Sequence, residues 1–382
     1  MTEACSLEEL TSRAVLAIAS TQRSVGEHGF PFAAGATDGD HRWTLTHGEF
    51  WTEGLWLGQL WSAYHHSGDD AFRLAAESMY ERIRHRRVDA STHDLGFLFV
   101  PSALAGWEAT GRERYRLDAL EAAATLATRY DPECQLILAW DVLDGVPVGR
   151  VAIIDTLVNL QLLYWASSQP GGGHLGELAR PALDQMIRLL IRPDGSIRQM
   201  VRFEGTGRDL RSAPVQHQGY ARESCWSRGL GWGIYGLACA YTHYADPSYL
   251  AKADQLVAYY RANVPADLVP SYDFADPGGV EGAPRDSSAA TITAAGLAKL
   301  WHATGGERYR QLAHDIAYSL TAHRYFVADQ ENARGLIAHG CFHYPKRQFV
   351  DAQLVFGDYY FVEALTLLQS EGRTDSPRRG AT

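Results

Sequence analysis

Acidic residues recur in six short segments of the sequence, beside aromatic, amide or basic residues with which they could share one site. The segments are 49–54, 93–97, 154–159, 218–229, 285–288 and 357–360. Several also contain Trp or Tyr, as at Trp51, Trp226 and Tyr359. Aromatic rings stack on the C–H faces of sugar rings, and carboxylates form charged hydrogen bonds with hydroxyl groups. This pairing favours a carbohydrate site.

Asp155 is the most informative of these acids. It follows the apolar residues 151–154, where an ionised group is costly unless it has partners or a chemical role. We therefore predict that Asp155 is functional. Acids at helix starts are often simple N-caps, and this alternative applies to Asp94 and Asp286. Arg228 has an alternative role as the partner of a structural carboxylate.

Metal and disulfide chemistry find little support in the sequence. Histidines occur together at 65–66 and at His339 with His343, but no carboxylate pattern accompanies either pair. The five cysteines are widely scattered and lack CxxC spacing: Cys5, Cys134, Cys225, Cys239 and Cys341. We predict no metal, no cofactor and no disulfide framework.

Helices with a 3.6-residue apolar period must position these segments. The sequence predicts twelve, at 7–23, 51–66, 70–87, 97–109, 113–129, 151–167, 174–191, 223–244, 247–262, 286–303, 307–323 and 353–370. Strand-like patterning is scarce. The second helix of several pairs opens with Gly, Asp, Glu or Pro followed by an aromatic residue, as at 68–73, 111–116, 246–250 and 306–310. We interpret this as a weak repeat of helical hairpins.

The connections between these helices alternate in length. Those that follow the even-numbered helices are short, whereas most of those that precede them run for roughly 20 to 30 residues, so long loops gather at one end. The even-numbered helices are richer in Gly, Ala and aromatic residues and are predicted to be inner. Six such hairpins close into an all-α (α/α)6 barrel. Its pocket is expected at the end where the inner helices begin. Helix N-termini at that end would favour an anion.

Composition limits the domains and partners of the chain. Residues 1–370 are predicted to form one catalytic domain and residues 371–382 a disordered tail. The 35 basic and 45 acidic residues give a net charge of −10, which argues against nucleic acid and anionic membranes as partners. The acidic N-terminus and the lack of an apolar run of about 18 residues predict a cytoplasmic protein without a membrane span. The oligomeric state is left open.

These segments resemble the unsaturated glucuronyl hydrolases, glycoside hydrolase family 88, from about Trp51 to Leu365. The resemblance rests on the motifs at 93–97, 154–160, 192–196, 218–229, 286–290 and 357–365, taken in this order. It implies the (α/α)6 barrel and matches the family's two essential aspartates to Asp94 and Asp155. The residues expected to contact substrate are His93, Gln218, Trp226 and Arg228, together with Trp51 and Tyr359.

Three positions depart from the pattern of that family. Gln199 stands where His is often found, Leu230 stands where Gln is common, and Arg222 replaces a residue that is frequently acidic. These changes leave the parent polysaccharide, the linkage and the sulfation preference open.

The resemblance implies hydrolysis of lyase-generated oligosaccharides that end in a 4,5-unsaturated uronate, the expected partner of the protein. Asp155 is expected to protonate C4 of the vinyl ether and then help to deprotonate the water that attacks C5. Asp94 would stabilise the developing positive charge, and Arg228 would hold anionic or hydroxyl groups. Trp226 and Trp51 would form stacking walls.

Three alternative functions remain. An unsaturated rhamnogalacturonyl hydrolase shares the barrel and relies on a single dominant aspartate. A sugar epimerase with a similar barrel uses paired histidines, for which His93 and His217 give weak support. A helical-repeat binding scaffold would have no need of an acid beside an apolar segment.

Overall fold

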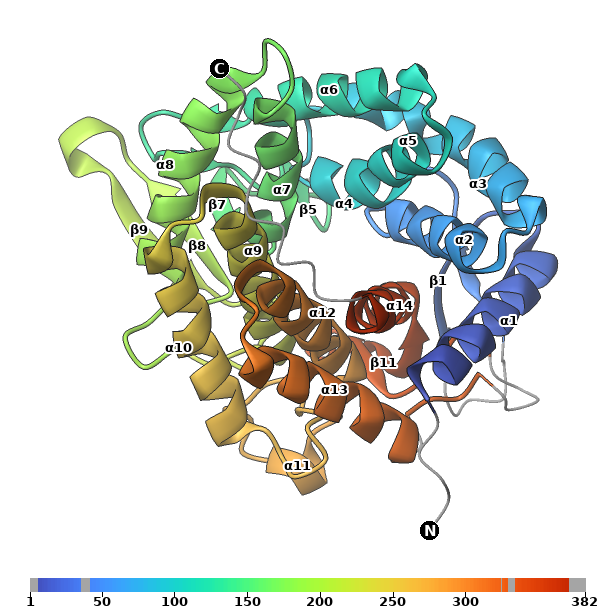
Figure 1. Ribbon diagram of the computed structural model, residues 1–382. Helices are drawn as coiled ribbons and strands as arrows, with labels where there is room; N and C mark the ends of the chain where they lie inside the picture. The colour runs from blue at the N-terminus through green and yellow to red at the C-terminus, as the bar shows by residue number, and fades with distance from the viewer. Residues whose placement is uncertain (1–5, 36–41, 324, 329–333, 371–382) are drawn as a thin grey trace.

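The inner ring of the molecule is built from helices that alternate along the chain with outer ones. The computed structural model describes residues 6–35, 42–323, 325–328 and 334–370. Inner helices are α2 (Glu53–Ser67), α4 (Leu95–Phe99) with α5 (Ala105–Thr110), α7 (Thr156–Ser167), α9 (Ser227–Tyr244), α12 (Ser287–Thr304) and α14 (Val355–Gln369). Each contacts the next, and α14 returns to α2, so the ring closes (Figure 1). This confirms the predicted (α/α)6 barrel.

The outer helices surround this ring and bury one face each. They are α1 (Leu7–Val25), α3 (Asp70–Ile83), α6 (Glu113–Ala127), α8 (Gly173–Leu190), α10 (Pro247–Asn263) and α13 (Glu307–Ala322). The repeated opening motif separates paired helices: Gly68 ends α2 in a left-handed conformation, and Asp69 caps α3. The aromatic residue of the motif is buried each time, at Phe72, Tyr115, Tyr249 and Tyr309.

The long connections contain strands that the sequence pattern did not reveal. One sheet has the order β10-β11-β1-β2, from β10 (Gly340–His343), β11 (Gln348–Leu354), β1 (Phe30–Gly35) and β2 (Thr44–Thr46). A second joins β7 (Arg150–Ile153), β8 (Met200–Glu204) and β9 (Arg211–Val215). Two hairpins pair β3 (Tyr130–Asp131) with β4 (Leu136–Ile137), and β5 (Val142–Leu143) with β6 (Val146–Pro147). All these strands lie in connections that precede inner helices. For β1 and β2 this is the connection between α1 and α2.

Four predicted helix starts are too early by two residues or more. Residues 51–52 precede α2, residues 151–153 lie in β7, residues 223–226 precede α9, and residues 353–354 belong to β11. The run at 151–154 contains three β-branched residues, which pack well on a pleated surface. Asp155 therefore lies at a strand-to-helix junction and not within an inner helix.

The starts of the inner helices pack against one another without side chains between them. A Cβ at Gly54 would overlap the backbone of Leu98, and one at Gly96 would overlap the backbone of Asn159. The Asn159 side chain also accepts a hydrogen bond of 2.9 Å from Phe97 N. A π turn at Val100–Leu104 joins α4 to α5 and interrupts the predicted helix at 97–109. This close packing gives the end of the ring a rigid base.

Three further sequence predictions concern membrane spans, the C-terminal tail and the cysteines. Among the described residues, no helix is long and apolar enough to cross a membrane. The predicted disordered tail at 371–382 lies outside the described residues. Cys134, Cys225, Cys239 and Cys341 are free and buried.

Candidate active site

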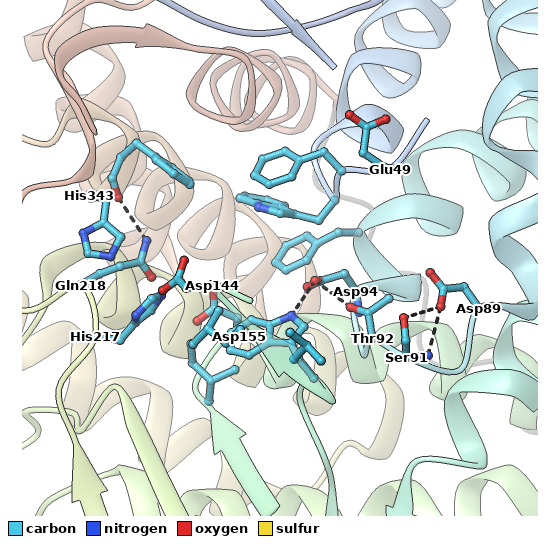
Figure 2. A pocket seen from close by; sticks show the side chains of 18 of the residues that line it. Glu49, Asp89, Ser91, Thr92, Asp94, Asp144, Asp155, His217, Gln218 and His343 are labelled. Atoms are coloured by element: carbon cyan, nitrogen blue, oxygen red, sulfur yellow. Dashed lines mark hydrogen bonds between the residues drawn. The ribbon is translucent and has the colours of Figure 1, made fainter. Parts of the chain in front are cut away.

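A cavity of about 620 Å³ opens at the end of the ring where the inner helices begin. Its walls combine residues at those helix starts with residues of the long connections. Six of the predicted site residues border it: Trp51, Asp94, Asp155, Gln218, Trp226 and Arg228. Figure 2 shows Asp155 between His217 and Gln218 on one side and Asp94 and Thr92 on the other. The cavity thus gathers segments far apart in the sequence.

Asp155 is held in place through its backbone, and one of its carboxyl oxygens has no partner among the described residues. The preceding Ile154 N donates to Gln199 O at 2.9 Å, which fixes the end of β7. Although Asp155 occupies the N-cap position of α7, its side chain caps none of the described N–H groups. Its Oδ2 is buried and has no hydrogen-bond partner among the described residues. Buried carboxyl oxygens are normally paired, so the unpartnered Oδ2 leaves the charged form of Asp155 without the usual stabilisation.

The surroundings of Asp155 favour its protonated form. Burial raises the pKa of this carboxyl to about 7, the Arg228 charge acts in the opposite direction, and the Asp94 charge adds to the rise. Near neutral pH, Asp155 therefore exists as both acid and carboxylate. A group with this pKa can donate a proton and then accept one, which is the requirement for general acid–base catalysis.

Asp94 is held by donors on its neighbours. Its Oδ2 accepts hydrogen bonds from Thr92 Oγ1 at 2.9 Å and from Trp140 Nε1 at 3.0 Å. The exposed fraction of Asp94 is 8%, and the residue borders the cavity. Trp140 lies in the connection before β5, so the sequence pattern gave no reason to connect it with Asp94. The arrangement fixes the orientation of one carboxylate beside a second, protonatable one.

His93 lies behind Asp94 and not on the cavity wall formed by the described residues. Its ring is fully buried, with Nδ1 2.9 Å from Thr156 Oγ1 and Nε2 3.3 Å from Asp94 Oδ1. Burial lowers the pKa of His93 to about 4, so the ring is neutral near pH 7. The geometry gives His93 a supporting place between α7 and Asp94, and its direct contact with substrate stays a prediction.

Arg228 combines a buried ion pair with a position at the cavity wall. Its Nη1 lies 3.0 Å from Asp286 Oδ2, and its two terminal nitrogens also donate to Cys341 O and Phe342 O, at 2.5 and 2.6 Å. Its guanidinium stacks 4.6 Å from the centre of the Trp226 ring. The structural alternative for Arg228 is thus present, and Asp286 acts as the N-cap of α12. The charge still reaches the cavity, because it lowers the pKa of Asp155.

Aromatic rings form much of the apolar lining. The Trp51 ring packs 5.0 Å from Phe97 and 5.3 Å from Phe356, measured between ring centres. Trp226 is 2% exposed, so little of its ring is open to a ligand, whereas Trp51 is partly exposed. Trp232 lies in the core. Trp51 therefore offers the larger stacking surface of the two predicted walls.

The family of the chain follows from comparison with known proteins. No family model matches the sequence. An unsaturated glucuronyl hydrolase of Formosa agariphila is 32% identical over 323 residues, which cover 84% of this chain and 80% of that protein. An unsaturated chondroitin disaccharide hydrolase of Streptococcus pyogenes serotype M1 is 31% identical over 94% of this chain and 91% of that protein. The chain belongs to the unsaturated glucuronyl hydrolase family.

A solved structure gives the same assignment. The unsaturated glucuronyl hydrolase from Bacillus sp. GL1, responsible for the degradation of glycosaminoglycan, superposes with a TM-score of 0.86. It is 31% identical, and the match covers 95% of this chain and 97% of that one. The resemblance drawn from the sequence motifs is therefore confirmed, and with it the assignment to the hydrolases.

One predicted substrate-binding residue of this hydrolase lies away from the cavity. Tyr359 is one turn into α14, where its ring packs against Gly58 of α2 and lies 4.9 Å from the Tyr360 ring. It is not among the described residues that line the cavity. The structure therefore does not bring Tyr359 together with the other predicted site residues, and its contact with substrate stays a prediction. A helix start brings only one face to the pocket, and on α14 that face does not include Tyr359.

Several cavity residues come from connections that the sequence did not place. His217 and His343 face each other with ring centres 4.9 Å apart, and Lys346 pairs with Asp144 on the β5–β6 hairpin. Burial lowers the pKa of His217 to about 4 and that of His343 to about 3. Both rings are therefore neutral near pH 7. Within the described part of the chain, no cluster of three His, Cys, Asp or Glu side chains is arranged for a metal ion.

Proposed function

We propose that the protein removes the 4,5-unsaturated uronate from the non-reducing end of lyase-generated oligosaccharides, with Asp155 as the catalytic acid. The observation that carries this proposal is the Asp155 carboxyl, which belongs to a residue bordering the cavity, has a pKa raised to about 7 and leaves its buried Oδ2 without a partner among the described residues. A vinyl ether needs a proton donor of this kind. The membership of the family supports the same reaction.

The first step is proton transfer to carbon. The C4=C5 bond is conjugated with the ring oxygen, so a proton delivered from Asp155 to C4 leaves a positive charge shared by C5 and that oxygen. The anomeric bond is untouched at this stage. An acid with a pKa near the working pH suits this step, because it is both populated and acidic enough to give up its proton.

The second step is the addition of water at C5. The Asp155 carboxylate left by the first step accepts a proton from the attacking water, which returns Asp155 to its acid form. The product is a hemiketal at C5. Ring opening then gives a 5-ketone and releases the downstream sugar from C1, so the double bond is consumed and the glycosidic bond is broken without direct attack on the anomeric carbon.

Asp94 stabilises the positive charge that develops between these steps. Its hydrogen bonds from Thr92 and Trp140 fix its orientation beside Asp155, and a preorganised charge avoids the cost of reorganisation during the reaction. His93 supports this arrangement from behind. Its contacts with Thr156 and Asp94 link the start of α7, and therefore Asp155, to the start of α4.

Recognition of an anionic sugar by this acidic protein must be local. Arg228 is a buried cation at the cavity wall whose charge acts on Asp155, and Trp51 supplies an aromatic surface for the C–H face of the ring. Gln218 adds an amide at the opposite wall (Figure 2). With a net charge of −10, long-range attraction contributes little to binding.

Loss of ultraviolet absorbance by the conjugated double bond tests the reaction directly. We expect the absorbance of unsaturated disaccharides to fall on addition of the protein, with release of the downstream sugar in equal amount. A panel derived from hyaluronan, chondroitin, heparin, gellan and ulvan identifies the preferred parent polysaccharide. Substrates with a saturated uronate serve as the matched control and should remain intact.

The competing functions give different results in the same assay. Turnover confined to pectin-derived unsaturated disaccharides would favour the rhamnogalacturonyl hydrolases. Isomerisation with the glycosidic bond preserved would favour an epimerase. Absence of turnover on every unsaturated substrate would contradict the proposal.

A further inference from the structure

Gln199 connects the catalytic acid to the opposite wall of the cavity. It immediately precedes β8, and its carbonyl accepts the Ile154 N–H that fixes the strand leading to Asp155. Its side chain is 7% exposed and turns toward the 216–224 connection. Gln199 is not one of the described residues that border the cavity. A role at the site must therefore act through another residue.

Both the oxygen and the nitrogen of the Gln199 side-chain amide form hydrogen bonds with Gln218. Its Oε1 accepts hydrogen bonds from Gln218 N at 2.8 Å and from Gly219 N at 3.3 Å. Its Nε2 donates to Gln218 Oε1 at 2.9 Å. A buried amide with its donor and acceptor both in use has one favourable orientation. Gln199 thus fixes both the backbone and the side chain of Gln218.

This contact decides which atoms Gln218 presents to a ligand. Gln218 Oε1 is occupied by Gln199, and Gln218 Nε2 donates to Phe342 O at 3.1 Å, the carbonyl that also accepts from Arg228 at 2.6 Å. An amide nitrogen carries two N–H groups. The second one has no partner within residues 6–35, 42–323, 325–328 and 334–370, and Gln218 borders the cavity. The wall therefore offers a donor.

We propose that Gln199 is a positioning residue that turns the Gln218 amide so that an N–H faces the cavity and selects an acceptor-only oxygen of the substrate. A carboxylate oxygen of the uronate has this character. The proposal rests on the function proposed above. It explains how the protein orients one contact that distinguishes substrates, the one between the Gln218 N–H and the uronate carboxylate. If the amide were reversed, Gln218 would present a carbonyl oxygen to the same carboxylate, and two acceptors would repel each other.

The Gln199→Glu variant separates this role from general support. The new carboxylate can still accept from Gln218 N but cannot donate to Gln218 Oε1, so the Gln218 amide loses its fixed orientation. We expect KM for an unsaturated uronate disaccharide to rise about tenfold with kcat within about twofold, the size expected for one lost hydrogen bond to a charged group. Gln199→Met, which has similar length and no amide, should raise KM in the same direction.

The preference for the free uronate over its methyl ester distinguishes the proposed role of Gln199 from a purely structural one, because a general loss of support would affect both substrates alike. Both compounds carry the vinyl ether, but the ester lacks the charged acceptor. We expect the preference of the wild-type protein for the acid, measured as a ratio of kcat/KM values, to fall several-fold in both Gln199 variants. Gln216→Ala is the matched control, because Gln216 bonds Gly219 O and Tyr220 O in the same connection without contacting Gln218.

Wild-type ratios of acid to ester in both Gln199 variants would overturn the proposal. So would an equal change in Gln216→Ala, because that result would assign the effect to the connection as a whole. Thermal unfolding of each variant identifies loss of the fold, and the two Gln199 variants provide independent tests. Failure of the wild-type protein to turn over any unsaturated uronate would contradict the proposed function instead, so the two failures are distinguishable.

Discussion

Asp155 and Asp358 are two acids at the same end of the ring, and burial of their carboxyl groups raises the pKa of each to about 7. Asp358 lies in the first turn of α14 and accepts a hydrogen bond of 2.9 Å from Ile337 N. Asp155 precedes α7, and its Oδ2 has no partner in the described part of the chain. Asp155 borders the large cavity, whereas Asp358 borders a narrow space beside Trp56. A raised pKa alone therefore does not identify a catalytic acid.

The acids at the other inner helix starts resemble Asp358 more than Asp155. Glu53 accepts from Gly48 N at 2.7 Å, and Asp286 accepts from Ser288 N at 3.2 Å while pairing with Arg228. Both hold a connection against the ring. Glu53 Oε2 is buried without a partner among the described residues, as Asp155 Oδ2 is, but of these four acids only Asp155 borders the cavity.

Replacement of Asp155 should have the largest effect on activity. We expect Asp155→Asn to lower kcat by about 10³-fold or more, since the amide cannot supply the proton to C4. The fold should be retained, because the Asp155 side chain supports no described hydrogen bond in which Asn could not replace it. Loss of the ultraviolet absorbance measures the activity, and thermal unfolding measures the stability. Turnover close to that of the wild type would contradict the role of Asp155.

Replacement of Asp94 should have a smaller effect and a distinct pH signature. Asp94→Asn keeps an oxygen that can accept from Trp140 and Thr92 but removes the negative charge, and we expect kcat to fall about 10²-fold. The charge of Asp94 raises the pKa of Asp155, so its removal should lower that pKa. Activity requires the acid form of Asp155. The alkaline limb of the kcat profile should therefore move to lower pH.

The pH profile of a second variant controls for a general change in cavity charge. Asp89 also borders the cavity, but its carboxylate is engaged by Arg86 and Ser91. Asp89→Asn should leave the alkaline limb where it is in the wild-type protein. An equal shift in both variants would assign the effect to net charge and not to Asp94.

Replacement of Asp358 should change stability and leave activity within about twofold. The raised pKa means that the folded protein binds this proton more tightly than the unfolded chain, so stability falls as pH rises from about 4 toward 7. Asp358→Asn removes this loss and should stabilise the protein above pH 7 by up to about 4 kcal/mol relative to its effect at pH 4. Denaturant unfolding at several pH values measures it. A large loss of turnover would remove the distinction between Asp358 and Asp155.

The ring of helices could be predicted because the features that indicate it lie close together in the sequence. Apolar periodicity, the Gly and Asp residues between paired helices and the alternation of loop lengths all lie within short stretches of chain. The same applies to Asp155, since the apolar run before it is visible in the sequence. The run at 151–154 was nevertheless assigned to a helix, because short apolar stretches do not distinguish a buried strand from a buried helix without knowledge of its partner β8.

The contacts that complete the site are not local and could not be predicted. Trp140 reaches Asp94 from a separate connection, and His343 meets His217 across 126 positions of the sequence. The orientation of Tyr359 depended on the phase of α14 around its own axis, which a helix boundary two residues in error is enough to change. Arg228 was visible as a charged candidate, but its partner Asp286 became evident only in the fold.

Closure of the ring ties the timing of folding to the formation of the cavity. Helix α14 packs on both α1 and α2, and Gln369 Nε2 donates to Leu7 O at 2.7 Å. The cavity draws residues from Gly48 to Gln348, so its wall has contributions from both sides of this seam. Contacts between such distant parts of a chain form late and slowly. During synthesis, the cavity therefore cannot be complete, and the enzyme cannot be active, until α14 has packed on α1 and α2.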